Sequence, residues 1–324
     1  MTRLPRLYGV MLRYRVAAMV ALFMLLGAAG EGRLELGVRY VWATLALASS
    51  YVAATALNDL ADEQIDKVNH PRDAGRPLVE GTATRRELML LHVFASAAAV
   101  AAAVPLGWRG LTAIALSLCV SQVYSAWPVR LSYRVAGAPV ALGLAYVLVP
   151  YSLGVVAAGG TVVHVRSRLV FGLFFLFVAR IVLKDFRDRE GDARYGKPTV
   201  LLRYGKTVTC AASLGALAAG DLALVAALDP RLAALLQPLV LAIAWMLRTL
   251  WHASSPRDEQ VAIGLGARMG NGLLLCLLGW LVVRGAGAPV ATAIVFVAAV
   301  CALFLASFAT LASRPGDVVI GYKG

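Results

Sequence analysis

The chain has 324 residues, of which 60% are hydrophobic and only 15% are charged. Soluble domains average about 45–50% apolar and about 25% charged residues, so this composition excludes an ordinary water-soluble protein and favours helices that span a bilayer. The formal net charge of +13 does not indicate nucleic-acid binding, because the basic residues gather at the N-terminus and in a few later segments, as the positive-inside rule describes.

Apolar runs of bilayer length recur from one end of the chain to the other. We predict nine or ten membrane helices, near residues 16–30, 40–57, 86–106, 110–127, 137–158, 168–184, 207–228, 232–251, 268–284 and 287–311. Gly and Arg residues interrupt the pattern around 264–271, so the last two could be miscounted. The runs do not alternate, which excludes a β-barrel and leaves helices as the way to satisfy the backbone in lipid.

The predicted fold is therefore an all-α membrane bundle. We expect a single polytopic domain over residues 1–324 in the cell (inner) membrane, with the N-terminus on the cytoplasmic side. The first apolar run also resembles the apolar region of a signal peptide, but the apolar segments that follow favour an uncleaved first helix.

Two polar, Asp-rich segments, which we expect to be loops, interrupt the pattern after the second and the sixth predicted helix, both on the predicted cytoplasmic side. The motif residues are Asn58, Asp59, Asp62 and Asp66 in the first segment and Asp185, Asp188 and Asp192 in the second. The aspartates in both are spaced by three and then four residues, which on a helix places them within an arc of roughly 60°. Each motif would then present one stripe of carboxylates, although Gly191 could end the second helix early and leave Asp192 on a loop.

Such stripes indicate a cation site. Like charges at this spacing destabilise a helix unless a cation compensates them, and carboxylates at a membrane boundary tend to mark function. Oxygen ligands suit Mg²⁺, which binds one or two carboxylates, several waters and substrate phosphate oxygens. The alternative is that the two acidic segments are solvated and balance nearby arginines.

Basic residues flank both motifs and could bind a diphosphate. Arginine offers forked donors that match phosphate oxygens, but each of these residues could equally be a positive-inside anchor. The candidates are Lys67, Arg72, Arg76, Lys184, Arg187 and Lys197, of which Lys67, Arg72 and Lys184 lie closest to the aspartates in sequence. His70 could assist the same site, whereas His92 is isolated and is interpreted as structural or interfacial.

The two motifs, NDLADEQID and DFRDREGD, resemble the signature motifs of the UbiA superfamily of intramembrane prenyltransferases. Three further segments are similar to that family: DKVNHPRDAGRPLVEG after the first motif, YSAWPVRLS from Tyr124 to Ser132, and GDARYGKPTVLLRYGK after the second motif. The resemblance extends from the second predicted helix to the start of the seventh. Beyond that point the chain matches only in hydropathy.

The resemblance implies a UbiA-like fold and a specific set of site residues. Two Mg²⁺ ions would be held by Asn58, Asp59, Asp62, Asp66, Asp185, Asp188 and Asp192, with Lys67, Arg72 and Lys184 on the phosphates. Tyr124 would face the reacting carbon, although an interfacial tyrosine is the competing interpretation. One departure concerns the acceptor: many family members open the fifth helix with a Gly-Asn pair, where this chain has Gly137-Ala138-Pro139.

The predicted function is Mg²⁺-dependent ionisation of an isoprenoid diphosphate and transfer of its prenyl group to an aromatic, quinone-precursor or other lipophilic acceptor. The ring side chains of Phe171, Phe174, Phe175 and Phe177 could line the prenyl tail or simply face lipid. Two alternatives stay open: a terpene cyclase on the same scaffold, in which the cation attacks its own chain, and a secondary transporter, whose acids usually lie near the bilayer midplane.

Overall fold

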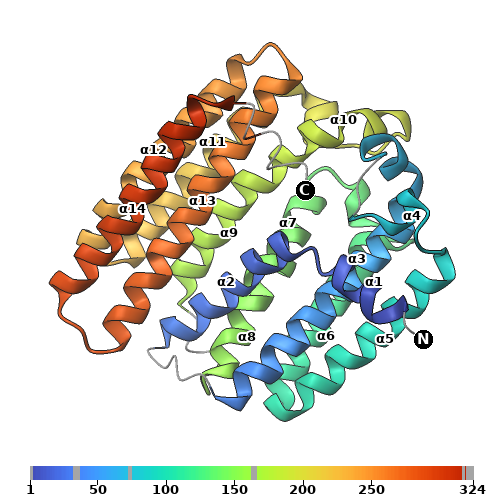
Figure 1. The fold of residues 1–324 in the computed structure, drawn as a ribbon, viewed down its shortest axis with the longest axis horizontal. Helices are drawn as coiled ribbons and strands as arrows, with labels where there is room; N and C mark the ends of the chain where they lie inside the picture. Colours follow the sequence, from blue (N-terminus) through green and yellow to red (C-terminus); the bar gives the residue numbers. More distant parts are fainter. Residues whose placement is uncertain (1–2, 32–36, 72–74, 162–165, 316–317, 319–324) are drawn as a thin grey trace. The chain divides into compact units, whose positions relative to one another are not determined.

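The computed structural model describes residues 3–31, 37–71, 75–161, 166–315 and 318, and within these ranges it is helical throughout, with no strand (Figure 1). The helices are α1 Arg3–Met11, α2 Tyr14–Gly30, α3 Val38–Asn69, α4 Pro77–Glu80, α5 Arg85–Ala103, η1 Val104–Leu106, α6 Gly107–Ser125, η2 Leu131–Tyr133, α7 Gly137–Gly143, η3 Leu144–Leu148, α8 Val149–Ala157, α9 Ser167–Ile181, η5 Val182–Lys184, α10 Asp185–Arg194, α11 Val200–Ala227, α12 Pro230–His252, α13 Pro256–Gly285 and α14 Val290–Ala312. The all-α prediction is confirmed.

The chain divides into two compact units, which are described separately. The first contains residues 1–28, 35–165 and 188–199, and the second contains residues 29–34, 166–187 and 200–324. The expectation of a single polytopic domain stays a prediction.

The first unit is built around α3, which packs along α5 and also contacts α6 and α8. Helix α5 begins with a capping box, because the Thr84 and Glu87 side chains each accept from the other's backbone N–H. Between α5 and α6 the chain turns back at Gly107, whose φ of 77° favours glycine. The fold-back brings Gln122 within 3.0 Å of His92, whose other ring nitrogen lies 2.9 Å from the carbonyl oxygen of Ala53. His92 thus links three helices, as its structural interpretation predicted.

The second unit is a set of helices in which α11 packs against α9 and α12, and α13 packs against α12 and α14 (Figure 1). Helices α9 and α11 approach closely at two glycines: a Cβ on Gly172 would lie 3.0 Å from the carbonyl oxygen of Gly220. Farther along, the Lys206 Nζ donates to the Glu259 carboxylate at 2.9 Å and to the carbonyl oxygen of Ala253. This ion pair joins the start of α11 to the start of α13.

The apolar helices account for the hydrophobic composition. Seven helical stretches of the described chain are long and apolar enough to cross a membrane, or eight if the bent pair α1–α2 forms one span. The predicted number of nine or ten is therefore not confirmed, although each predicted run overlaps a helix. One of the seven stretches, Arg85–Ser125, contains the fold-back between α5 and α6.

The difference from the predicted boundaries that matters for the site is in α3. The apolar pattern predicts an end near residue 57, whereas the helix continues to Asn69 and carries the whole first motif. The second motif is likewise helical, on α10. Neither Asp-rich segment is the loop expected from its polarity, because polar residues that stay on one helical face do not interrupt backbone hydrogen bonding.

Candidate active site

The first motif forms a buried stripe on α3. Asp59, Asp62 and Asp66 expose only 2%, 5% and 6% of their surface. Because the helix continues past Asp66, the three-and-four spacing places all three carboxylates on one face, as predicted. The Asn58 amide nitrogen donates to Asp62 Oδ2 at 3.3 Å.

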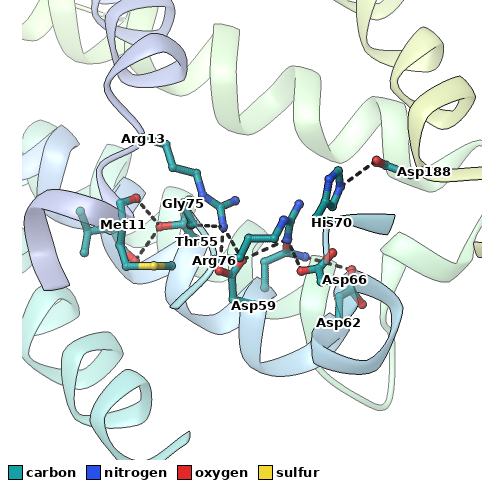
Figure 2. A network of polar contacts seen from close by, with 12 residues as sticks. Met11, Arg13, Thr55, Asp59, Asp62, Asp66, His70, Gly75, Arg76 and Asp188 are labelled. Atoms are coloured by element: carbon teal, nitrogen blue, oxygen red, sulfur yellow. Dashed lines mark hydrogen bonds and ion pairs between the residues drawn. The ribbon is translucent and has the colours of Figure 1, made fainter. Parts of the chain in front are cut away.

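Two arginines compensate the first and the last carboxylate of the stripe (Figure 2). Arg13, at the break between α1 and α2, donates to both oxygens of Asp59 at 2.7 Å and to the carbonyl oxygen of Gly75 at 3.2 Å. Arg76 forms an ion pair with Asp66, and its Nη1 also lies 3.6 Å from Asp59 Oδ1. Nearby, the Thr55 hydroxyl donates to the carbonyl oxygen of Met11 at 2.9 Å and fixes the end of α1 on α3.

A third and a fourth base meet at Asp62. Lys197 Nζ donates to Asp62 Oδ2 at 2.9 Å and lies 3.9 Å from Asp192 Oδ1, so one ammonium contacts both motifs. Arg130, from the segment after α6, donates to Asp62 Oδ1 at 3.3 Å and to the carbonyl oxygen of Ala61. Its guanidinium also stacks on the Tyr133 ring, 3.9 Å from the ring centre.

The end of α3 packs closely against the part of α10 that belongs to the first unit. The Gly191 N–H donates to Asn69 Oδ1 at 2.6 Å. A Cβ at Gly191 would lie only 2.6 Å from the carbonyl oxygen of Ile65, so glycine is required for this approach. One turn away, His70 Nε2 lies 3.0 Å from Asp188 Oδ1 (Figure 2). The possibility that Gly191 ends the helix is wrong: α10 runs on to Arg194, and Asp192 is helical.

The donor set fits a hard divalent cation. Asp59, Asp62, Asp66 and Asp192 are buried, and with the partly buried Asp188 they offer carboxylate oxygens within one unit. Among the described residues, no three acidic, His or Cys groups are arranged as a preformed metal cage. Several of these oxygens instead face Arg or Lys nitrogens. The positive charge beside these carboxylate oxygens is thus supplied by side chains, and a bound metal ion would take over that role.

Comparison with known proteins identifies the family. The model of the UbiA prenyltransferase family matches residues 16–271. The chain belongs to the UbiA prenyltransferase family.

Similar proteins include the digeranylgeranylglyceryl phosphate synthase of Methanothermobacter thermautotrophicus, 27% identical over 278 residues, with 84% of this chain and 93% of that protein covered. The homogentisate phytyltransferase of a Synechocystis species is 29% identical over 225 residues, which covers 66% and 70% of the two chains. The fold is similar to that of a UbiA homolog from Archaeoglobus fulgidus bound to DMAPP and Mg²⁺, with a TM-score of 0.67, 18% identity, and 85% and 98% of the chains covered.

The protein is thus an intramembrane prenyltransferase of the UbiA family. The relatives are named as enzymes of this type, and none of them supports the terpene cyclase alternative. They differ in the names of their products and substrates, so the family alone does not select an acceptor.

The structure brings some of the predicted UbiA site residues together and not others. Asn58, the three first-motif aspartates, Asp188, Asp192, Arg76 and Lys197 gather in the first unit. Lys67 is exposed and pairs instead with Glu63 at 2.8 Å, on another face of α3. Lys184, Asp185 and Arg187 belong to the second unit, and Arg72 lies outside the described residues. Tyr124 is buried near the end of α6, with 8% of its surface exposed.

Three residues at the site were missed in the sequence. Arg13 lies 46 residues before its partner Asp59, and no local pattern connects them. Arg130 is the basic residue of the YSAWPVRLS segment, so the family resemblance of that segment could have marked it as a site residue. Asn69 follows the first motif by three residues and continues the helical spacing, which could have marked it as a neighbour of the stripe.

Proposed function

We propose that the protein transfers a prenyl group from an isoprenoid diphosphate to a lipophilic acceptor, with two Mg²⁺ ions bound at the two aspartate motifs. The proposal is supported mainly by Lys197, which contacts both Asp62 and Asp192 and so brings the two motifs into one buried cluster. A relative of the same fold binds DMAPP and Mg²⁺. We place the site at the cytoplasmic face of the cell (inner) membrane, because both motifs lie among the basic segments of the chain.

The aspartates and Asn58 hold the metal ions in this proposal. When bound, Mg²⁺ neutralises the charge that grows on the departing diphosphate. We retain Asp185 as a further metal ligand, because it is the first aspartate of the second motif and the family resemblance implies this role. His70 keeps Asp188 oriented through its 3.0 Å contact.

The bases now paired with the aspartates are the proposed diphosphate ligands. Arg13, Arg76, Arg130 and Lys197 all contact a carboxylate that we assign to a metal ion. Arginine and lysine have long side chains that can turn from a carboxylate to a phosphate a few ångströms away. We retain Lys67, Arg72, Lys184 and Arg187 as further candidate ligands, because a diphosphate has several oxygens and can accept from more than one base.

The helices around the site exclude water from the reacting prenyl group. A prenyl cation would otherwise be hydrolysed. We propose that Tyr124 lies beside the reacting carbon, and that the aromatic residues of α9 contact the prenyl tail. Of these, Phe171 is 52% exposed, and its ring centre lies 4.5 Å from that of Phe175, with the two ring planes tilted by 46°. The acceptor is an aromatic compound, a quinone precursor or another lipophilic molecule, and it attacks the prenyl carbon and then loses a proton.

The test is the isosteric substitution Asp62→Asn. It removes the charge that Lys197 and Arg130 both contact and is expected to lower Mg²⁺-dependent release of diphosphate by a factor of about 10² or more, the loss typical of an electrostatic catalytic group. Asp221→Asn is the matched control, because Asp221 is an acid of an apolar helix that hydrogen-bonds to Gln237 in the other unit. Full activity of Asp62→Asn, or turnover in excess EDTA, would refute the metal site.

A further inference from the structure

A histidine lies among the carboxylates of the first unit. His70 directly follows the last residue of α3, and its backbone N–H donates to the carbonyl oxygen of Asp66 at 2.8 Å. Its φ of −137° and ψ of 53° are not helical, so the chain turns away from the axis of α3 at this residue. The imidazole Nε2 lies 3.0 Å from Oδ1 of Asp188 on α10 (Figure 2). The middle aspartate of the second motif therefore has a nitrogen atom beside it.

Packing between the end of α3 and α10 fixes the position of this imidazole. Asn69, the residue before His70, accepts the Gly191 N–H at 2.6 Å. A Cβ on Gly191 would lie 2.6 Å from the carbonyl oxygen of Ile65, so the two helices are in backbone contact here. Asp188 is in the same turn of α10 as Gly191. The side chains of His70 and Asp188 are 9% and 16% exposed, so the nitrogen and the carboxylate are held together and largely shielded from water.

The spacing of the two atoms suits two ligands of one metal ion. Adjacent ligands of an octahedral ion, each about 2.1 Å from it, lie about 3.0 Å apart. The Nε2–Oδ1 distance has this value. Asp192 follows Asp188 by four residues on α10 and is buried, so its carboxylate lies on the same helical face. The end of α3 and this face of α10 thus offer one nitrogen and two carboxylates to a cation.

Imidazole differs from the other bases at the motifs in what it can do when a cation binds. Arg13, Arg76, Arg130 and Lys197 contact the motif carboxylates as hydrogen-bond donors. A guanidinium or an ammonium has no lone pair for a metal ion, so each of these groups competes with the ion for its carboxylate. A neutral imidazole has such a lone pair and is a common metal ligand. His70 can therefore bind the ion together with Asp188.

The type of ligand selects the metal. Mg²⁺ is a hard ion that takes oxygen ligands, whereas imidazole favours first-row transition ions, among which Mn²⁺ also accepts carboxylates and water. We propose that His70 is a nitrogen ligand of the metal ion at the second motif and gives this site a preference for Mn²⁺ over Mg²⁺. The inference rests on the proposed function, which assigns a metal ion to this motif, and it adds the chemical class of that ion.

The first test detects the bond between the metal ion and nitrogen and does not depend on turnover. One equivalent of Mn²⁺ is added to purified, untagged protein in detergent, with and without inorganic diphosphate, and pulsed EPR of the frozen samples records nitrogen nuclei coupled to the bound Mn²⁺. We expect imidazole coupling in the unaltered protein and its loss in His70→Gln. Glutamine has an amide N–H that can keep the hydrogen bond to Asp188, but it has no imidazole lone pair.

His252→Gln is the matched control, because His252 is exposed at the end of α12 in the second unit. This variant should keep the coupling. Labelling the unaltered protein with ¹⁵N-histidine must shift the signal to that of the heavier isotope, and this measurement stays valid if His70→Gln does not fold.

The second test compares two metal affinities in the same variants. In His70→Gln the affinity for Mn²⁺ should fall about 10-fold or more, since changes around metal ligands already cost about 10- to 100-fold. The concentration of Mg²⁺ that displaces Mn²⁺ from the unaltered protein gives the starting preference. The affinity for Mg²⁺ should change by less than about threefold in His70→Gln, because the oxygen ligands that Mg²⁺ prefers stay in place.

The outcomes separate this inference from the proposed function. The inference is overturned if the unaltered protein shows no nitrogen coupling, or if His70→Gln keeps the coupling. An equal loss of Mn²⁺ and Mg²⁺ affinity would also overturn it, because a histidine that only orients Asp188 would affect both ions alike. None of these results contradicts Mg²⁺-dependent prenyl transfer. Nitrogen coupling from His70 in a protein that releases no diphosphate from any prenyl diphosphate, with either ion, would overturn the proposed function alone.

Discussion

Gly191 allows the close approach of the two motif helices, α3 and α10. The substitution Gly191→Ala therefore tests how much this approach contributes to stability and to catalytic activity. The added Cβ would lie 2.6 Å from the carbonyl oxygen of Ile65 and 2.7 Å from Asn69 Oδ1. Such overpacking typically costs about 1–3 kcal/mol, and the displaced Gly191–Asn69 hydrogen bond costs about 0.5–1.5 kcal/mol more. Alanine regains about 1 kcal/mol of helix propensity. The net expectation is a loss of about 0.5–3.5 kcal/mol.

The effect on activity should exceed the effect on stability. The Ile65 carbonyl lies in the same turn of α3 as two motif aspartates and cannot move without them. The strain therefore displaces either Asp62 and Asp66 or Asp188 and Asp192. A shift near 1 Å in a catalytic constellation can cost about 10²-fold in rate. We expect kcat/KM to fall 10- to 100-fold and the Mg²⁺ concentration for half-maximal activity to rise.

The assay combines thermal unfolding in detergent with a Mg²⁺ titration of diphosphate release. The matched control is Gly215→Ala in α11, where an added Cβ meets nothing within 4 Å. It should leave the Mg²⁺ dependence unchanged and raise stability by up to about 1 kcal/mol through helix propensity. If Gly191→Ala behaves like Gly215→Ala in both measurements, the close approach of the motifs does not position the carboxylates.

Two further substitutions test the charge balance and the local helix signals. Lys197→Met removes the ammonium that Asp62 now contacts at 2.9 Å but leaves Arg130 at 3.3 Å. We therefore expect a loss of about 1.5–3 kcal/mol of stability in EDTA, the range for one hydrogen bond to a charged group, largely recovered when Mg²⁺ is added. An equal loss with and without Mg²⁺ would contradict this. Thr84→Ala removes the capping box of α5 and should lower stability by about 1 kcal/mol, with no change in kcat/KM. An altered Mg²⁺ dependence of this variant would show that the cap also positions residues of the site.

Hydropathy and motif spacing were enough to predict the helical fold and the carboxylate stripes, because both are local. The three-and-four spacing of Asp59, Asp62 and Asp66 fixes a common face on any helix that continues through them. Proximity in sequence was a poor guide to the bases. Lys67 follows Asp66 directly, yet one residue turns a helix by about 100°, and Lys67 pairs with Glu63 instead.

The bases at the site come from distant segments because their positions depend on tertiary packing. Arg13 reaches Asp59 from the break between α1 and α2, where its own φ is 44°. Arg130 reaches Asp62 from the segment after α6, also with a left-handed φ, of 41°. Left-handed conformations of this kind are energetically unfavourable for residues other than glycine, and an arginine in the sequence does not predict one. Only the packed unit reveals that both arginines face the stripe.

The pairing of acids and bases in the first unit also bears on how substrate enters. Arg13, Arg76, Arg130 and Lys197 contact the buried aspartates of the motifs. An uncompensated buried carboxylate costs several kcal/mol, so these bases lower the cost of burying the motif aspartates. A prenyl diphosphate carries on the order of three negative charges at neutral pH, whereas the two Mg²⁺ ions of the proposed site would add four positive ones.

Bound together, the prenyl diphosphate and the two Mg²⁺ ions would change the charge of the site by only about one unit. Either the diphosphate or the metal ions alone would change it by about three or four units. In a buried site, where charges interact more strongly than in water, the joint change is far less costly than either separate one. The two affinities are therefore coupled, and by linkage each partner must raise the affinity of the other by the same factor. In the proposed site, the bases of the first unit would set the size of that coupling, because they are the charges that would exchange carboxylate for phosphate contacts when substrate and metal bind.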